Sequence, residues 1–326
     1  MAALALGMTD PARADKVELE AAFDRALGTE TRAPASFDAV YASGLEAQIA
    51  RIANGAQGRI GVAAIDLSTG RTLGVLGDQR FPMASTSKIA VAAAFLEGVE
   101  KGKWSLTSEF PLLIPVSSAR YSSRVAPVRE GNYLPASQLI ELMITRSSNP
   151  ATDALLRVIG GPEAVNDWVR RAGIRDFELT RDIATLVRDD GEFDPAATID
   201  RRDSATPQAM VQLVAGLHQG KWLNAAHRRV ILGAMERCVT GKRRIPAMLP
   251  STTLVAHKTG LFNNTSTAIG LIHLPDGRAI AVAIYVTGQG SRLAREGRIA
   301  EIARALYNGY SAPAYTALTN ANYSGS

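Results

Sequence analysis

A serine and a lysine three residues apart are the first candidates for catalysis in this chain. Ser85 and Lys88 precede an alanine-rich apolar stretch at residues 89–96, a composition that strongly favours a helix. On a helix, residues three apart lie on the same face, so Lys88 is expected beside Ser85. A serine hydroxyl becomes an effective nucleophile when a neighbour takes its proton, and a lysine can do so when burial or positive charge lowers its pKa. The pair therefore predicts a serine nucleophile with a lysine base, unless it is only a helix cap with a solvated lysine.

Two other short motifs decide between these interpretations. Residues 147–149 read Ser-Ser-Asn and lie between two predicted helices, whereas residues 258–260 read Lys-Thr-Gly at the end of a predicted strand. Each of the three motifs occurs once in the chain. Their order and separation place one motif on each wall of a cleft between two lobes.

The elements that must position these motifs form two groups along the chain. Strands are predicted at 59–67, 71–76, 253–258, 265–274 and 278–286. Helices are predicted at 38–53, 85–102, 135–146, 150–159, 164–171, 206–218, 225–238 and 292–307. Because strands from both ends flank a helical middle, the simplest α/β (α+β) architecture is one antiparallel sheet flanked by terminal helices, with an inserted all-helical domain. A cleft between two such lobes is a natural binding site.

The chain is accordingly divided into four parts. These are a signal remnant and leader at 1–37, a sheet domain at 38–104 plus 236–310, an all-helical domain at 105–235, and a flexible tail at 311–326. Ala12-Arg13-Ala14 follows an apolar start and fits the Ala-x-Ala cleavage pattern of a signal peptide. We therefore expect a periplasmic or secreted protein.

Composition argues against several classes of function. The net charge is +5, but the basic residues are scattered and not clustered with aromatic residues, so no nucleic-acid partner is expected. No apolar run reaches the roughly 18 residues that a membrane helix needs, so no integral membrane segment is expected. Cys238 is the only cysteine, which excludes an internal disulfide. The four histidines do not pair at metal-ligand spacing, so neither a metal nor a cofactor is expected, and we assume a monomer.

The ordered triplet resembles one enzyme superfamily. Ser-x-x-Lys at 85–88, Ser-x-Asn at 147–149 and Lys-Thr-Gly at 258–260 are similar to the motifs of the class A β-lactamases and the penicillin-binding D-alanyl-D-alanine peptidases. The resemblance covers about residues 38–309, and the predicted secondary structure around each motif agrees with it. It implies the sheet-and-helix fold of that family and an acyl-enzyme reaction.

The resemblance also implies a role for each matched residue. Ser85 attacks the carbonyl carbon and becomes acylated, Lys88 is its base, and Ser147 passes a proton to the leaving nitrogen. The backbone N–H groups of Ser85 and Leu261 form the oxyanion hole, in which one donor is typically worth about 3 kcal/mol. The implied substrate-binding residues are Asn149, Lys258, Thr259, Gly260, Leu261 and Tyr121, of which Tyr121 is explained equally well by ordinary packing.

One segment departs from the resemblance in a way that changes the chemistry. Arg181 and Asp203 match the neck of the family's Ω-loop, where an ion pair between them has a structural role. β-Lactamases carry a Glu two residues after that Arg, and this Glu activates the water that hydrolyses the acyl-enzyme. Here the position holds Ile183, which cannot accept a proton, so deacylation is expected to be weak or slow. Alternative bases in the loop are Asp182, Asp189, Asp190, Glu192 and Asp194, although a solvated acidic loop explains these residues too.

A second departure concerns the substrate carboxylate. Thr267 stands where many class A enzymes have an arginine, and Arg292 or Arg295 is the expected substitute. Leu261 and Phe262 are bulkier than usual after the Lys-Thr-Gly motif and are expected to narrow the cleft.

We therefore expect a serine acyl-enzyme hydrolase of the class A β-lactamase type, acting on a small-molecule β-lactam or a peptidoglycan peptide. The alternatives are a D-alanyl-D-alanine carboxypeptidase or other penicillin-binding protein, an acylated but idle β-lactam sensor, and an esterase for unrelated small esters. The intact catalytic motifs argue against an idle sensor. Turnover of a D-Ala-D-Ala peptide, repeated release of opened antibiotic and a panel of chromogenic esters would separate these functions.

Overall fold

The computed structural model describes residues 29–31, 43–54 and 57–312. Of the predicted leader at 1–37, only β1 (Thr29–Thr31) is described. The predicted tail at 311–326 lies outside the described residues from residue 313 onward. The start of the helix predicted at 38–53 also lies outside them, and the described part of that helix, α2, spans Gly44–Ala53.

A five-stranded antiparallel sheet with the strand order β10-β11-β12-β2-β3 is the centre of the fold. Its strands are β2 (Ile60–Asp66), β3 (Thr72–Val75), β10 (Val255–Phe262), β11 (Thr265–His273) and β12 (Ala279–Thr287). The N-terminal and C-terminal strands join where β12 pairs with β2, with Ala283 opposite Ala63. This pairing confirms the predicted fold class, in which strands from both ends of the chain form one sheet.

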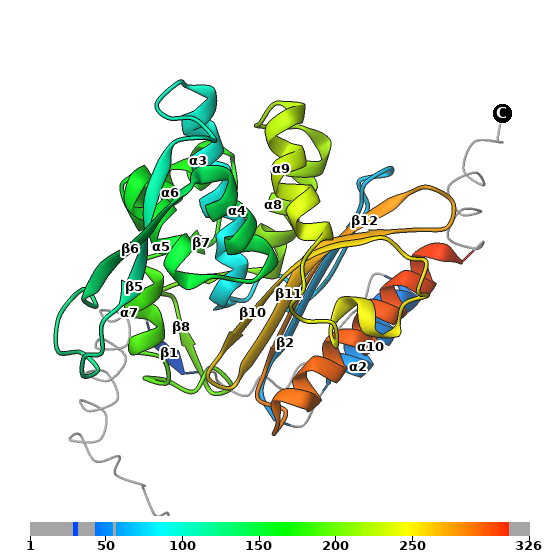
Figure 1. Cartoon of the computed structure of the whole chain (residues 1–326). Helices are drawn as coiled ribbons and strands as arrows, with labels where there is room; N and C mark the ends of the chain where they lie inside the picture. The colour runs from blue at the N-terminus through cyan, green and yellow to red at the C-terminus, as the bar shows by residue number, and fades with distance from the viewer. Residues whose placement is uncertain (1–28, 32–42, 55–56, 313–326) are drawn as a thin grey trace, which may run out of the picture.

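Helices cover both faces of the sheet (Figure 1). The helices α2 and α10 (Arg292–Ser311) lie side by side on one face, and α8 (Pro207–Gln219) lies against the other. On β2, Val62 and Ala64 belong to the core on the α10 side, whereas Ala63 belongs to the core on the α8 side. Because both faces are buried, the strands are almost continuously apolar. No helix in the described part of the chain is long and apolar enough to cross a membrane.

The remaining helices form a second lobe around α3. They are α3 (Lys88–Glu100), α4 (Ala136–Thr145), α5 (Asn149–Ile159), α6 (Pro162–Arg171), α7 (Ile183–Arg188) and α9 (Ala225–Glu236). The helix α3 packs against α4, α5, α6 and α9, and its residues 88–93 are all buried. A helix that is apolar all round belongs in a core, which explains why the alanine-rich run after Ser85 has no polar face.

The region predicted to be all-helical also contains strands, so that prediction was wrong in part. The strands β5 (Glu109–Pro115) and β6 (Val128–Pro135) form an antiparallel hairpin. Shorter strands in this region are β7 (Phe177–Glu178), β8 (Thr198–Asp200) and β9 (Ser204–Ala205), and β4 (Phe81–Pro82) lies before it in the chain. The hairpin was missed because β5 contains two prolines and β6 is mostly polar, so neither shows the regular alternation that identifies a half-buried strand. The boundaries of the sheet and helical domains stay a prediction.

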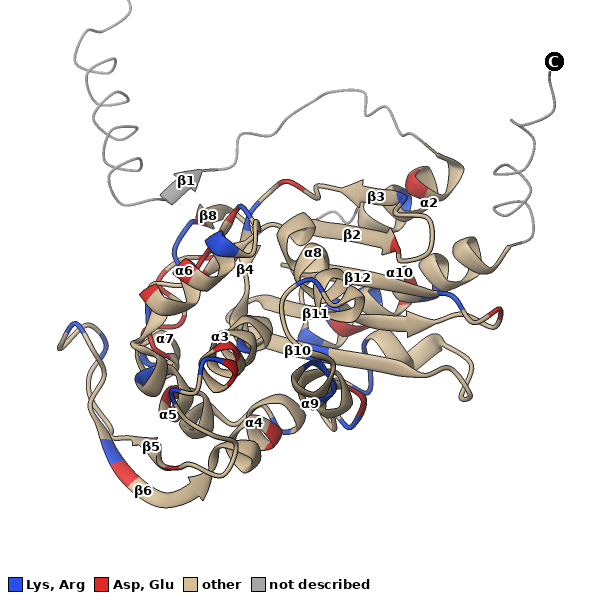
Figure 2. Ribbon diagram, turned by 90° about the horizontal axis from the view of Figure 1, so that it is seen from above, with Lys and Arg blue, Asp and Glu red and all other residues tan. Residues whose placement is uncertain are grey.

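Charged side chains are nearly absent from the five-stranded sheet (Figure 2). The helices and loops carry most of the Lys, Arg, Asp and Glu residues, whereas the five strands contain only Asp66 and Lys258. A buried charge is costly unless it is paired. Asp66 accepts a hydrogen bond from the backbone N–H of Ser68 and pairs with Arg278, so its structural role is clear. Lys258 is therefore the charged strand residue whose location indicates function.

Candidate active site

Ser85 lies in a short 3-10 helix, η1 (Ala84–Ser87), that leads directly into α3. The turn before Ser85 is tight, because Ala84 has φ +48°, a left-handed conformation that non-glycine residues rarely adopt. Thr86 Oγ1 donates a hydrogen bond to Met83 O at 2.7 Å and closes this turn. Ser85 itself is half-buried, at the point where the buried helix α3 begins. Such a position keeps a nucleophile fixed and still accessible.

Lys88 is fully buried at the first position of α3 and is held by the Ser-Ser-Asn motif. Its Nζ donates hydrogen bonds to Asn149 Oδ1 at 2.7 Å and to the carbonyl oxygen of Ser147 at 2.8 Å. Among the described residues, no hydrogen bond joins Lys88 Nζ to Ser85 Oγ. The structure therefore joins the first two motifs through Lys88, Ser147 and Asn149, and not through a direct Ser85–Lys88 bond.

Ser147 lies between the two lysines of the motifs. It occupies the loop between α4 and α5 with φ +59°. Its Oγ is 3.4 Å from Lys88 Nζ and 3.0 Å from Lys258 Nζ. A hydroxyl has two lone pairs and one proton, so Ser147 can accept from both amines and still donate to a third group. This arrangement is suited to passing a proton.

Burial lowers the pKa of both lysines, and the charge of Lys258 lowers that of Lys88 further. The pKa of Lys88 is held well below its usual 10.5, first by burial and then by the charge of Lys258, whereas Asp153 raises it. Burial lowers the pKa of Lys258 to about 8, with Cys238 acting to raise it and Arg244 to lower it. The lowered pKa of Lys88 favours the neutral amine that can accept a proton, whereas Lys258 stays mostly charged at neutral pH.

The Lys-Thr-Gly motif lies inside β10, and not at the end of a strand as predicted. The strand packs against η1, and Gly260 permits this close approach. A Cβ at Gly260 would stand 2.7 Å from Ala84 Cβ and 2.9 Å from Met83 O, which is too close for any side chain. The contact places the residue before Leu261 against the two residues before Ser85. The oxyanion hole formed by their N–H groups stays a prediction.

The other predicted substrate-binding residues, Thr259, Leu261 and Tyr121, differ in burial and in their contacts. Thr259 is buried, and its Oγ1 lies 2.8 Å from Thr240 Oγ1. Leu261 and Tyr121 are exposed, with 43% and 54% of their surfaces accessible. Tyr121 is attached to the Ω-loop, because its backbone N–H donates to Asp189 Oδ1 at 3.1 Å and its hydroxyl to Asp189 O at 3.3 Å. Leu261 and Tyr121 thus present apolar surface to solvent.

Arg292 and Arg295, the two arginines expected to bind the substrate carboxylate in place of an arginine at position 267, form hydrogen bonds with other groups. Arg292 is largely exposed, and its Nε is 3.0 Å from Glu296 Oε1. Arg295 Nη1 donates to Asn264 Oδ1 and to Gly288 O, both at 3.0 Å. Neither prediction is supported by these contacts.

Arg244 is the cationic residue that sequence reasoning missed. It is buried, and its Nη1 donates to the carbonyl oxygens of Gly260 at 2.6 Å and Thr267 at 2.7 Å. Its Nη2 is 3.2 Å from Glu296 Oε1, which partly neutralises it. In the sequence Arg244 ends a Lys-Arg-Arg run, which is typical of a solvated surface, so no signal distinguished it from its neighbours. The structure places it directly behind the Lys-Thr-Gly motif, beside the position left uncharged by Thr267.

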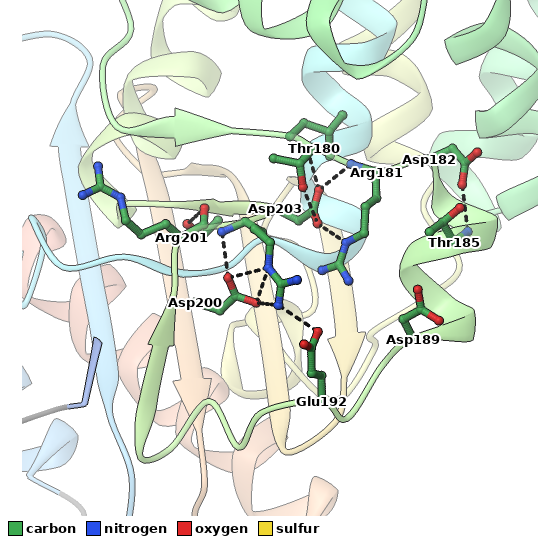
Figure 3. A network of polar contacts seen from close by, with 12 residues as sticks. Thr180, Arg181, Asp182, Thr185, Asp189, Glu192, Asp200, Arg201 and Asp203 are labelled. Carbon is green, nitrogen blue, oxygen red and sulfur yellow. Dashed lines mark hydrogen bonds and ion pairs between the residues drawn. The ribbon is translucent and has the colours of Figure 1, made fainter. Parts of the chain in front are cut away.

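Arg181 and Asp203 form the neck of the loop between them (Figure 3). Arg181 Nε and Asp203 Oδ2 are 2.6 Å apart. Asp203 also accepts hydrogen bonds from the backbone N–H groups of Thr180 at 2.7 Å and Arg181 at 3.1 Å. Because Asp203 is buried, this single carboxylate ties the start of the loop to its end.

The loop itself offers no carboxylate bonded to the catalytic motifs. Ile183 is the first residue of α7 and is buried, with 2% of its surface exposed. The five candidate acids all bond elsewhere: Asp182 to Thr185 N–H, Asp189 to Arg188 and Tyr121, Asp190 to Asn263 N–H, Glu192 to Arg202, and Asp194 to Ala196 N–H and Asn264 Nδ2. None of them, within the described residues, forms a hydrogen bond with Lys88 or Ser147. They stabilise the loop and attach it to the rim of the cleft.

Comparison with known proteins identifies the family. A profile described as the beta-lactamase enzyme family matches residues 44–310. The chain belongs to the β-lactamase enzyme family. Beta-lactamase SME-1 of Serratia marcescens is 31% identical over 243 residues, which cover 74% of this chain and 80% of that protein. Extended-spectrum beta-lactamase PER-1 of Pseudomonas aeruginosa is 27% identical over 277 residues, which cover 81% of this chain and 86% of that protein.

Solved β-lactamase structures share the fold. A β-lactamase from Chitinophaga pinensis has a TM-score of 0.71 at 28% identity, covering 82% of this chain and 99% of that one. A variant of the class A β-lactamase of the last common ancestor of Gram-negative bacteria has a TM-score of 0.70 at 33% identity, covering 82% of this chain and 98% of that one. This member of the β-lactamase family is therefore a serine hydrolase with the class A fold.

Proposed function

We propose that this protein of the β-lactamase family is acylated at Ser85 by its substrate and deacylated slowly. The observation that carries the proposal is Ile183, a buried apolar side chain at the position where the resemblance places the water-activating Glu. The acids of the loop do not replace that Glu, because each is already bonded to other groups of the loop or rim. The proposed substrates are β-lactams and acyl-D-Ala-D-Ala-like amides.

Acylation would use Ser85 together with Lys88, Ser147 and Lys258, which are joined by hydrogen bonds. Lys88, with its lowered pKa, takes the proton of Ser85 Oγ as that oxygen attacks the carbonyl carbon. Ser147 then donates its own proton to the nitrogen that leaves, and it recovers a proton from Lys88. One O–C bond forms and one C–N bond breaks, and the proton of Ser85 is accounted for on the leaving nitrogen.

The positive charge of the site supports an anionic substrate. Penicillins and peptides that end in D-alanine both carry a carboxylate close to the bond that breaks. Lys258, which stays mostly charged at pH 7, points its Nζ at Ser147 Oγ, and Thr259 follows it on the strand. Arg244 adds a second buried cation behind the strand. A hydrogen bond from a charged lysine to a substrate carboxylate would be roughly twice as strong as one between neutral groups.

Deacylation requires a base for water, and Ile183 cannot act as one. General-base catalysis by a positioned side chain is typically worth about 10²–10⁴-fold. The acyl-enzyme is therefore expected to outlast that of a β-lactamase with the Glu by about the same factor. This is the behaviour of a penicillin-binding protein on a β-lactamase fold.

Intact-mass spectrometry tests the proposal directly. The protein and its Ser85→Ala variant are each mixed with a penicillin and followed for hours. We expect a stable adduct of the mass of the penicillin in the wild type and no adduct in the variant. An adduct that disappears quickly while the penicillin is consumed would show that another base exists, and the absence of any adduct or consumption would reject reaction with β-lactams.

A second assay separates the peptidase from the sensor. A D-alanyl-D-alanine carboxypeptidase releases D-alanine from an acyl-D-Ala-D-Ala peptide repeatedly, whereas an idle sensor does not. The intact set of Ser85, Lys88, Ser147 and Lys258 favours the peptidase over an idle sensor. Release of D-alanine, measured with a coupled oxidase, is expected to depend on Ser85.

Export to the periplasm or medium is part of the same proposal. Ala12-Arg13-Ala14 lies outside the described residues, so its support comes from the sequence alone. N-terminal sequencing of the protein recovered outside the cytoplasm is expected to begin at residue 15. A chain that retains residues 1–14 would contradict cleavage there.

A further inference from the structure

Asp153 is a buried carboxyl group on the helical wall of the cleft that sequence reasoning did not single out. It lies on α5, four residues after Asn149, so the two side chains share one face of that helix. Asn149 is the residue whose Oδ1 accepts the hydrogen bond from Lys88 Nζ. Only 3% of the surface of Asp153 is exposed. The carboxyl group therefore stands one helical turn behind the contact that holds Lys88.

Asp153 also holds the start of the Ω-loop helix. Its Oδ1 accepts a hydrogen bond from the backbone N–H of Ile183 at 2.7 Å, and its Oδ2 accepts one from the N–H of Ala184 at 2.9 Å. Both oxygens are thus directed at the first turn of α7. In this geometry the carboxyl group is fixed between α7 and α5, and it is not free to bind a water for hydrolysis.

Asp153 belongs to a group of charged side chains that come from α5, α3, β10 and the residue before α7. Asp153 faces the charge of Lys88 from α3 and that of Asp182 from the residue before α7. Lys88 in turn faces Lys258 from β10 and Asp153 from α5. Burial and the charge of Asp182 raise the pKa of Asp153 to about 7, while its two backbone hydrogen bonds and Lys88 act to lower it. The carboxyl group and the amine are therefore coupled across the wall of the cleft.

We propose that Asp153 is a positioning residue for Lys88, and that its carboxylate stabilises the ammonium form of Lys88 created when Ser85 is acylated. The inference rests on the proposed function, because it assigns Asp153 to the acylation step of that reaction. Lys88 receives the proton of Ser85 in a buried site, where an isolated positive charge is costly. Asp153 offsets this cost in a chain whose loop position 183 has no carboxylate.

The contacts of Asp153 predict that it affects the acylation step and not the deacylation step. The carboxylate acts on Lys88 through its charge, and both of its oxygens are occupied by N–H groups of α7. Asp153 is therefore expected to set the pH dependence of acylation without setting the lifetime of the acyl-enzyme. A residue with a purely structural role would change stability and leave the pH dependence alone.

The variant Asp153→Asn tests this distinction, and Asp66→Asn is its matched control. Asp66 is equally buried and accepts backbone N–H bonds from Ser68 and Thr69, but it is the last residue of β2 and pairs with Arg278. The rate constant for acylation by a penicillin is measured from pH 5 to 9 by quench-flow and intact-mass spectrometry. At low pH the acylation rate constant is expected to fall because Lys88 becomes protonated. In Asp153→Asn we expect the midpoint of this acidic limb to lie about one pH unit lower than in the wild type, the low end of the effect of a nearby opposite charge. The control is expected to keep the wild-type limb.

The lifetime of the acyl-enzyme is measured on the same samples. We expect it to stay within about twofold of the wild type in Asp153→Asn, because the carboxyl group does not activate water. A folded Asp153→Asn protein with an unshifted acidic limb would overturn the inference. A much longer lifetime with an unshifted limb would overturn it too, and would make Asp153 a base for deacylation.

A reciprocal measurement keeps the inference testable if Asp153→Asn does not fold or no β-lactam reacts. Coupling between two groups acts equally in both directions. In protein with ¹³C-labelled aspartate carboxyl groups, Lys88→Met is therefore expected to raise the titration midpoint of one buried aspartate by about one pH unit. An unchanged set of aspartate midpoints would reject the coupling. This NMR titration needs no substrate, so it separates failure of the inference from failure of the proposed function.

Discussion

Under the proposed function, replacing Ile183 by glutamate should speed deacylation. The side chain at 183 begins at the first turn of α7, next to the carboxyl group of Asp153, which accepts the backbone N–H of Ile183 at 2.7 Å. A Glu here would supply a general base, an effect worth about 10²–10⁴-fold. The new carboxylate would also share a buried site with the existing one, and like charges oppose each other.

The repulsion between the carboxylate introduced at position 183 and that of Asp153 determines how much of the new Glu is ionised. Two unit charges about 5 Å apart interact by about 3 kcal/mol at an effective dielectric constant of 20, which corresponds to about two pKa units. A Glu with a reference pKa of about 4.3 would then titrate near pH 6 to 7, and burial would raise it further. At pH 7 the Glu would therefore be only partly ionised. We expect Ile183→Glu alone to speed deacylation about tenfold and Ile183→Glu with Asp153→Asn to speed it at least about a hundredfold.

The assay is the decay of the acyl-enzyme by intact-mass spectrometry, with turnover of a chromogenic cephalosporin as a second readout. Ile183→Gln is the matched control, because glutamine has the shape of glutamate but cannot act as the base. The lifetime in this control is expected to stay within about twofold of the wild type. If Ile183→Gln shortened the lifetime as much as Ile183→Glu, water access and not basicity would be limiting. If the folded double variant remained as slow as the wild type, the assignment of Ile183 to the position of the base would be wrong.

Three further predictions concern the cleft and the loop. Ser147→Ala should slow acylation about 10²–10³-fold with an intact fold, because it removes the hydroxyl between Lys88 and Lys258; a loss below tenfold in quench-flow would exclude the proton transfer. Lys258 is charged below its pKa of about 8 and neutral above it, so acylation should fall as pH rises through 8. This basic limb should disappear in Lys258→Arg, since arginine stays charged, and a limb that persists would belong to another group. Asp203→Ala should lower the free energy of unfolding by about 3 kcal/mol in urea titration, because it leaves Arg181 and two backbone N–H groups without their buried acceptor; a change below about 1 kcal/mol would show that the neck is not structural.

The sheet and the three motifs could be predicted because their signals are local. The strands of the C-terminal part are almost continuous apolar runs separated by turn residues, and both of their faces are buried in the structure. Ser85, Lys88 and the residues at 147–149 and 258–260 are identified by short spacings within single elements or turns. Such short spacings do not depend on the tertiary structure. The structure then brings Lys88, Ser147 and Lys258 into one hydrogen-bonded group.

The rest of the site depends on contacts between distant segments. Asp153 is bonded to the backbone of Ile183 because α7 approaches α5, which joins residues thirty positions apart. Arg244 is buried only because β10 and α10 enclose it, although its sequence neighbours suggest a solvated charge. The β5–β6 hairpin lacks the alternation of a regular strand. In each of these cases the tertiary structure supplies the burial or the partner, and no short pattern encodes it.

The exchange of Glu for Ile changes the charge of the site as well as its chemistry. Lys88 and Lys258 both lie within hydrogen-bonding distance of Ser147 Oγ, and the charge of Lys258 disfavours the charged form of Lys88. Among the described residues, Asp153 is the carboxyl group that acts to raise the pKa of Lys88. A second carboxylate at position 183 would keep Lys88 protonated more of the time, whereas Ile183 leaves it closer to the neutral form that accepts the proton of Ser85. Under the proposed function, Ile183 would therefore remove the base for deacylation and also lower the pH at which Lys88 becomes able to accept the proton of Ser85.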